Sequence, residues 1–166
     1  MKKKFIDYFM SVAELTANLS HAKKLKVGSV IVKDDRIISC GYNGLPVGWE
    51  PNTCEKVSFV SDSEYFDSSN EEQQKYVPVD GTFFWKSMKT YDEVIHSEAN
   101  AISRLASSTE TGIDSVMFCT HSPCIQCSKI IYGAGIKTVY YKHDYRSSDG
   151  IAFLEKCNVE VIKYID

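Results

Sequence analysis

The spacing of apolar positions predicts helices in four parts of the chain. Residues 5–19 and 96–106 place apolar side chains three or four positions apart, which indicates amphipathic helices. Pro123 is expected to open a third helix, because proline fits the first helical position. Residues 149–157 predict a short fourth helix.

Runs rich in β-branched residues predict five strands. The first two flank a Lys33–Asp35 turn and are expected to form a β-hairpin. The five predicted strands are residues 27–32, 36–41, 115–120, 137–141 and 159–164. The order of elements after the first helix is therefore β-β-α-β-α-β-α-β.

Residues 54–93 interrupt this alternation and are predicted to form an irregular acidic insert. Nine acidic and four basic residues give the insert a net charge of −5, so the rest of the chain carries +2. Its aromatic residues argue against simple disorder. Two interpretations stay open: an ordered flap or subunit contact, and a solvated loop.

Composition favours small-molecule chemistry in the cytoplasm. The 166 residues suffice for one domain, expected to span 1–166, and a net charge of −3 does not favour nucleic-acid binding. The N-terminal segment mixes charged and apolar residues, so no membrane span is expected. Four of the six cysteines are predicted to be free thiols, since nothing indicates secretion.

The two remaining cysteines belong to a predicted zinc site. His96, Cys124 and Cys127 are soft or borderline ligands, and a zinc ion with three protein ligands keeps a fourth position for water. Glu98 is then the expected base. Both clusters are predicted at helix N-termini, whose partial positive charge favours thiolates and lowers cysteine pKa values.

Other interpretations of Cys124-x-x-Cys127 stay open on spacing alone. Cys119 and His121 could complete a closed structural zinc site. A redox pair has the same spacing but is expected after an early strand, and here His-x-Glu precedes it. A zinc-stabilised binding protein would need a fourth ligand and would make Glu98 dispensable.

The combination of His-x-Glu with Pro-Cys-x-x-Cys is the signature of zinc nucleobase deaminases. The sequence resembles the cytidine and deoxycytidylate (dCMP) deaminase superfamily. The stretches most similar to its dCMP deaminase branch are Gly41–Gly48 (Gly-Tyr-Asn-Gly-Leu-Pro-Val-Gly), Asn100 and residues 26–32 and 135–141. This resemblance implies a three-layer α/β/α sandwich with a mixed five-stranded sheet. It also implies hydrolysis of dCMP to dUMP and ammonia, which supplies dUMP for thymidylate synthesis.

The same resemblance implies roles for individual residues. Asn43 is expected to contact sugar or base, Asn100 to help hold the nucleotide, and the backbone around Thr120 and Ser122 to contact the amino group. No arginine-rich phosphate clamp is evident, so the candidates for phosphate binding are Lys26, Tyr145 and Arg146.

Assembly and regulation are also implied by the family. Relatives are mostly homohexamers, and many respond to dCTP and dTTP at a loop matching Gly41, Tyr42, Asn43 and Gly44, with Mg²⁺ accompanying the nucleotide effector. One zinc ion is expected, since only Cys54 and distant His21 could contribute to a second site. Ser97 replaces the usual alanine, which should be tolerated. A deaminase of another cytosine compound or of tRNA adenosine stays an alternative.

Overall fold

The computed structural model describes residues 1–61, 74–79 and 82–165, and for the strand residues 57–61, 74–79 and 82–87 it describes the backbone alone. The helices are α1 (Lys3–Ala17), α2 (Ser97–Ala106), α3 (Ile125–Gly133) and α4 (Asp149–Lys156). The strands are β1 (Gly28–Lys33), β2 (Arg36–Tyr42), β3 (Glu55–Ser61), β4 (Gln74–Val79), β5 (Thr82–Thr90), β6 (Val116–His121), β7 (Thr138–His143) and β8 (Glu160–Lys163).

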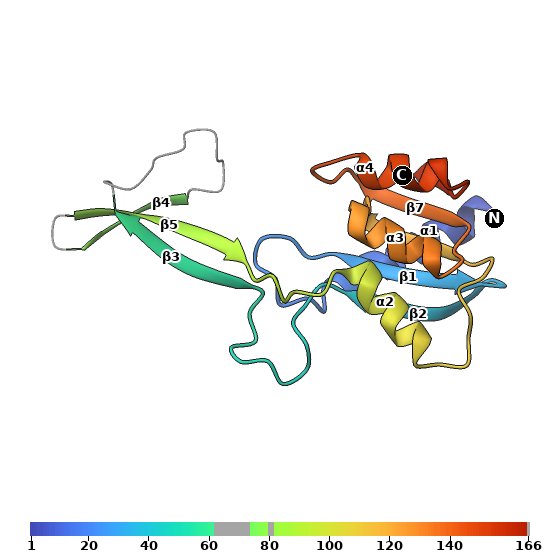
Figure 1. The fold of residues 1–166 in the computed structure, drawn as a ribbon, viewed down its shortest axis with the longest axis horizontal. Coiled ribbons are helices and arrows are strands. Elements are labelled where there is room, and N and C mark those ends of the chain that lie inside the picture. The colour runs from blue at the N-terminus through green and yellow to red at the C-terminus, as the bar shows by residue number, and fades with distance from the viewer. Residues whose placement is uncertain (62–73, 80–81, 166) are drawn as a thin grey trace.

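Five strands form a mixed sheet in the order β2-β1-β6-β7-β8 (Figure 1). β1 is antiparallel to β2 and β6, whereas β6, β7 and β8 run parallel to one another. Parallel strands need crossover connections, and α3 and α4 supply them. The predicted mixed five-stranded sheet is confirmed.

Helices cover both faces of this sheet, which confirms the predicted three-layer fold. On one face α1 packs on alternate positions of β1 and β6 through a cluster that contains Phe9, Met10, Ala13, Val30, Val32 and Phe118. On the other face α2, α3 and α4 pack through a cluster that contains Ile31, Ala101, Leu105, Met117, Ile131, Val139 and Leu154. Adjacent residues such as Val30 and Ile31 therefore face opposite layers, as the two-residue period of a strand requires.

The insert differs from its prediction, because its described residues form a second sheet. β3, β5 and β4 are antiparallel, in the order β3-β5-β4, and they extend away from the main body (Figure 1). β3 pairs with β5 from Glu55 opposite Thr90 to Ser61 opposite Phe84. Aromatic and β-branched residues favour strands. The acidic side chains of residues 62, 64, 67, 71, 72 and 80, whose charge defined the insert, lie outside the described residues.

Within the described residues, no helix combines the length and the apolar composition needed to cross a membrane.

Candidate metal centre and active site

The starts of two helices place the three predicted zinc ligands. His96 is the N-cap of α2, and Cys124 is the N-cap of α3, with Cys127 in the first turn. Pro123 was predicted to be the first helical residue, but the helix begins at Ile125. The reason is local, because the Cys124 Sγ atom accepts a hydrogen bond from the Cys127 N–H and so acts as the cap.

The ligand atoms have the spacing that a tetrahedral zinc ion requires. The His96 Nδ1 atom lies 3.6 Å from the Cys124 Sγ atom and 3.4 Å from the Cys127 Sγ atom. Zinc bonds of about 2.0 Å to nitrogen and 2.3 Å to sulfur at tetrahedral angles put these atoms about 3.5 Å apart. The residues therefore fit zinc, with His96 binding through Nδ1.

The cluster contains three ligands among the described residues, and all three atoms lie within 4.8 Å of one another. Cys119 and His121, which could have closed the site, are held elsewhere. Cys119 is fully buried and contacts Ser29 in the neighbouring strand, while the His121 ring contacts the Thr120 hydroxyl. The geometry therefore favours a site with a fourth position for water over a closed structural site.

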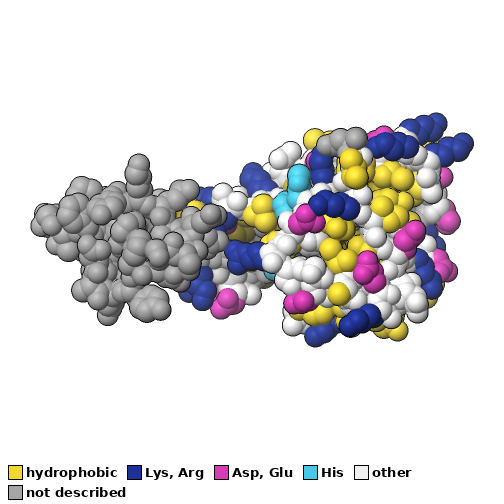
Figure 2. Space-filling view, turned by 90° about the horizontal axis from the view of Figure 1, so that it is seen from above, with side chains coloured by type: hydrophobic (Ala, Val, Ile, Leu, Met, Phe, Trp, Pro, Cys, Tyr) yellow, Lys and Arg dark blue, Asp and Glu magenta, His cyan; other side chains and the backbone are white. Residues whose placement is uncertain are grey.

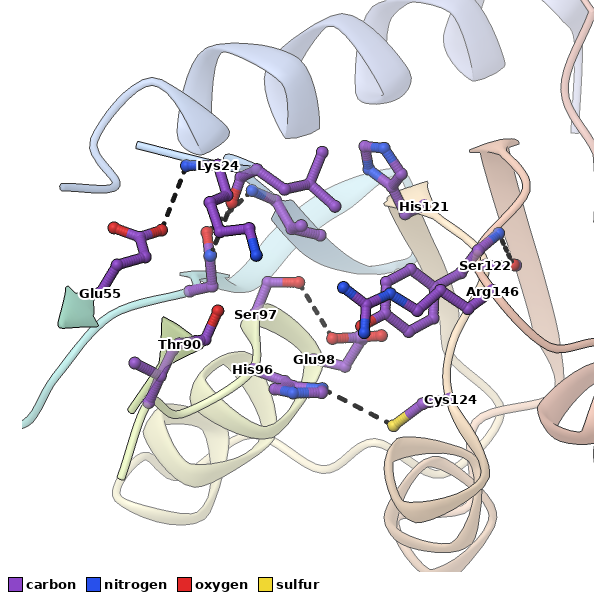
Figure 3. Close-up of a pocket in the computed structure, with 15 residues that line it drawn as sticks. Lys24, Glu55, Thr90, His96, Ser97, Glu98, His121, Ser122, Cys124 and Arg146 are labelled. Carbon is purple, nitrogen blue, oxygen red and sulfur yellow. Dashed lines mark hydrogen bonds between the residues drawn. The ribbon is translucent and has the colours of Figure 1, made fainter. Parts of the chain in front are cut away.

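Glu98 lies in the first turn of α2 and lines the same cavity as His96 and Cys124 (Figure 3). Its side chain is 4% exposed, and its Oε2 atom accepts a hydrogen bond from the Ser97 hydroxyl at 3.0 Å. Within a helix, residues two apart, such as His96 and Glu98, do not share a face. Here His96 precedes the helix and Glu98 lies in its first turn, so both can face one ion. A carboxylate is thus placed beside the predicted water position.

Burial dominates the electrostatics of the Cys127 thiol. It raises the pKa of Cys127 well above its usual range, and the nearby charges of Glu98 and Cys124 raise it further. The expectation that the helix N-terminus lowers cysteine pKa values is therefore wrong for Cys127 without zinc, because removal from water outweighs the helix dipole. A positive ion in the cluster would reverse this balance.

A cavity of about 310 Å³ connects the cluster to solvent. Four predicted binding residues line it: Asn43, Ser122, Tyr145 and Arg146. The Ser122 hydroxyl accepts a hydrogen bond from the Tyr145 N–H at 2.8 Å, and the Arg146 guanidinium lies over the Tyr145 ring at 5.9 Å. One short segment after β7 is thereby fixed against the start of α3.

Other predicted residues support the wall from behind, outside the set that lines the cavity. Asn100 donates from its amide to the Tyr42 carbonyl at 2.9 Å. The Thr120 hydroxyl accepts from the Gly28 N–H at 3.1 Å. Lys26, Gly41 and Gly44 also lie outside the lining. A Cβ atom at Gly41 would lie 2.4 Å from backbone atoms of α2, so glycine allows this helix to pack closely on β2.

The side chain of Asn43 joins two segments of the wall. Its Oδ1 atom accepts from the Val27 N–H at 2.8 Å, and its amide donates to the Leu25 carbonyl at 2.9 Å. Asn43 therefore positions the 25–27 segment, whatever contact it makes with a ligand.

We expect the Asn43→Ala substitution to lower stability and weaken substrate binding. Loss of both hydrogen bonds leaves the Leu25 carbonyl and the Val27 N–H unpaired, at a cost of about 1–3 kcal/mol. Thermal unfolding and the KM for substrate measure the two effects. Asn52→Ala is the matched control, because Asn52 is exposed in a loop. Equal melting temperatures for both variants would contradict this role.

Eight further residues that were not predicted as site residues of the deaminase line the cavity: Lys24, Leu25, Val27, Glu55, Thr90, Val94, Ser97 and His121. Glu55 is 4% exposed and accepts hydrogen bonds from the N–H groups of Lys23 and Lys24, so the first insert strand fixes the 23–27 segment. Burial, and then His143, lower the pKa of His121. Only His121 had a signal in the sequence, its position three residues before Cys124.

Fold and site together define a zinc-binding enzyme of three-layer α/β/α architecture. The family described as "Cytidine and deoxycytidylate deaminase zinc-binding region" matches residues 3–143. The chain belongs to this family.

Individual relatives agree with this assignment. The chain is 32% identical to "Deoxycytidylate deaminase" of Mycobacterium phage D29, over 81% of this chain and 91% of that protein. It is 33% identical to "ComE operon protein 2" of Bacillus subtilis, over 85% of this chain and 60% of that protein. A dCMP deaminase from the cyanophage S-TIM5, solved in complex with dCMP and dUMP, matches with a TM-score of 0.77 and 36% identity, covering 99% of each chain.

Proposed function

We propose that the protein hydrolyses dCMP to dUMP and ammonia. The observation that carries this proposal is that His96 and Cys124 of the ligand cluster line one cavity together with the Glu98 carboxylate. The family assignment supports deamination of a cytosine ring, and the relatives named for dCMP support the nucleotide. Formation of dUMP would supply thymidylate synthesis, in the cytoplasm of the cell or of a phage host.

The protein's own residues would divide the reaction as follows. His96, Cys124 and Cys127 hold zinc, which when bound makes a water nucleophilic near neutral pH. Glu98 accepts the proton from that water as its oxygen attacks ring carbon C4. Glu98 passes this proton to ring nitrogen N3. It then takes the second proton from the hydroxyl formed at C4 and gives it to the leaving amine as the C4–N bond breaks, so one carboxylate acts as base and as acid. Water and dCMP are consumed, and dUMP and ammonia are formed.

The cationic side of the cavity is proposed to bind the 5′-phosphate. Lys24 and Arg146 line the cavity. On the face drawn in Figure 2, Lys and Arg side chains and an acidic side chain lie beside a histidine. Charged donors bind phosphate oxygens more strongly than neutral ones. Tyr145 and Arg146 keep their predicted role in this proposal. Lys24 takes the role considered for Lys26, which does not line the cavity.

Ammonia release from dCMP, CMP, deoxycytidine, dCTP and a tRNA fragment tests the proposal directly. The expected result is a clear preference for dCMP. Deamination of the tRNA fragment alone would favour the tRNA-editing alternative, and no ammonia from any of the five would overturn the proposed function.

We expect Arg146→Ala to raise the KM for dCMP about tenfold or more and to leave the KM for deoxycytidine almost unchanged. Loss of a charge-assisted contact to phosphate has this magnitude, and deoxycytidine has no phosphate to lose. Steady-state kinetics on both substrates measure the effect. Arg36→Ala is the matched control, since Arg36 is exposed and pairs with Glu110 away from the cavity. Equal changes for both substrates would contradict phosphate binding.

Assembly and effectors are finer parts of the same proposal. A homohexamer is supported by exposed apolar side chains on α1 and α3, among them Leu15 and Tyr132, which are 67% and 53% exposed. The family resemblance is the support for regulation by dCTP and dTTP at Gly41, Tyr42, Asn43 and Gly44. It is also the support for a Mg²⁺ ion that accompanies the nucleotide effector. Among the described residues, no cluster of three carboxylates accompanies that loop.

A further inference from the structure

A chain of buried polar groups leads from the centre of the sheet to Glu98. The Ser97 hydroxyl lies 3.0 Å from the Glu98 Oε2 atom and 2.7 Å from the Ser29 hydroxyl. The Ser29 hydroxyl also lies 3.5 Å from the Cys119 Sγ atom. Ser29, Ser97 and Cys119 are each 0% exposed. The polar atoms therefore depend on one another for hydrogen bonds.

Three elements hold this chain in place. Ser29 of β1 and Cys119 of β6 are direct partners across the antiparallel pair. Ser97 is the first residue of α2, directly above them. Its hydroxyl does not cap the helix, because His96 is the N-cap and Ser97 contacts Glu98 and Ser29 instead. The Ser97 hydroxyl thus bonds to the Glu98 carboxylate and does not cap the helix.

The number of hydrogens fixes the direction of the chain when Glu98 acts as a base. A carboxylate only accepts, and each serine hydroxyl has one hydrogen to donate. Ser97 must therefore donate to Glu98, and Ser29 must donate to Ser97. Each group in the chain then supports the next, ending at the Oε2 atom of Glu98.

We propose that Ser97 and Ser29 are positioning residues that hold the Oε2 atom of Glu98, so that its other oxygen is aimed at the reacting proton. This inference rests on the proposed deaminase function and deepens it. Ser97 acts directly on Glu98, and Ser29 acts through Ser97. When the support of a side chain that transfers protons is removed, kcat falls while substrate affinity is kept.

The test is a double-mutant cycle on kcat, using Ser97→Ala, Ser29→Ala and the double variant with dCMP as substrate. We expect Ser97→Ala to lower kcat about tenfold, with KM within about twofold and the same zinc content as the wild type. Ser29→Ala should lower kcat less. The double variant should match Ser97→Ala, because Ser29 has no route to Glu98 without Ser97.

Ser39→Ala is the matched control, since the Ser39 hydroxyl is also buried and donates to the Ala101 carbonyl of the same helix at 2.6 Å. It should lower the melting temperature and leave kcat unchanged. A similar fall in kcat for Ser39→Ala, or additive effects of Ser29→Ala and Ser97→Ala, would overturn the inference.

The outcomes separate this inference from the function on which it rests. An inactive wild type with bound zinc rejects the proposed function. An active wild type whose Ser97→Ala and Ser29→Ala variants keep kcat within twofold rejects the positioning role alone. If Ser97→Ala does not fold, kcat of Ser29→Ala decides the question, because its substitution lies in the sheet, away from the metal ligands.

Discussion

Replacing Glu98 by Gln is expected to lower kcat for dCMP about 10²–10⁴-fold while zinc content stays at the wild-type level. Gln has nearly the shape of Glu, so the helix start and the three ligands keep their positions. The amide cannot accept the proton from water or return it to the ring and the leaving amine. Ammonia release and metal analysis on the same preparation measure the two quantities.

Glu110→Gln provides the control for this substitution, because Glu110 is exposed and pairs with Arg36 far from the cavity. It should keep wild-type kcat. A Glu98→Gln variant that retains more than a tenth of wild-type kcat would exclude Glu98 as the acid and base. Loss of zinc from that variant would mean that the carboxylate supports the metal site itself.

The main sheet could be predicted from the sequence because its signals are local. Helical spacing in residues 5–19 and 96–106 and the β-branched runs at 27–32 and 115–120 each depend on neighbours in the chain. The ligands could be predicted for a similar reason. A metal requires particular residue types at short spacings, and His-x-Glu and Cys-x-x-Cys satisfy it.

The pairing of β3 with β5 in the second sheet could not be predicted, because it is not local. β3 and β5 lie far apart in the sequence, yet Glu55 pairs opposite Thr90. Glu55 and Thr90, the two residues of this pair, both line the cavity. Composition showed the acidic and aromatic character of the insert, but neither property specifies a register.

Contacts between side chains that are distant in the sequence could not be predicted either. The replacement of alanine by Ser97 was expected to be neutral, since small residues pack alike at a helix start. The structure places the Ser29 hydroxyl 2.7 Å away, from a strand 68 positions earlier. Asn43 shows the reverse case, where an amide expected at the ligand is bonded to the backbone of residues 25 and 27.

The layer beneath the site explains why the two helix starts converge. α2 contributes Ala101 and Leu105 to the same core cluster as Ile131 of α3, on one face of the sheet. The loop after β2 and the 91–95 segment are joined by paired hydrogen bonds between Gly44 and Ile95, which bring His96 to its place. Core packing and these hydrogen bonds therefore bring the two helix starts together.

Removal of zinc with a chelator is expected to abolish deamination and lower the melting temperature, and added zinc should restore both. A ligand that binds only the folded state stabilises it, so melting should depend on zinc concentration. The binding should also depend on pH. Burial raises the pKa of the Cys127 thiol in the metal-free protein, whereas zinc binds the thiolate, so binding releases a proton.

The sign of that pH dependence follows from the proton release. Below the raised pKa of Cys127, apparent zinc affinity should rise about tenfold per pH unit for each proton released, so zinc is lost as pH falls. Competition with a zinc indicator at pH 6, 7 and 8 measures this slope. Cys127→Ser should bind zinc weakly at every pH, while Cys157→Ser, at the C-terminal end of α4, should match the wild type. A pH-independent affinity would show that zinc does not bind the Cys127 thiolate, and with it the assigned ligand set would fail.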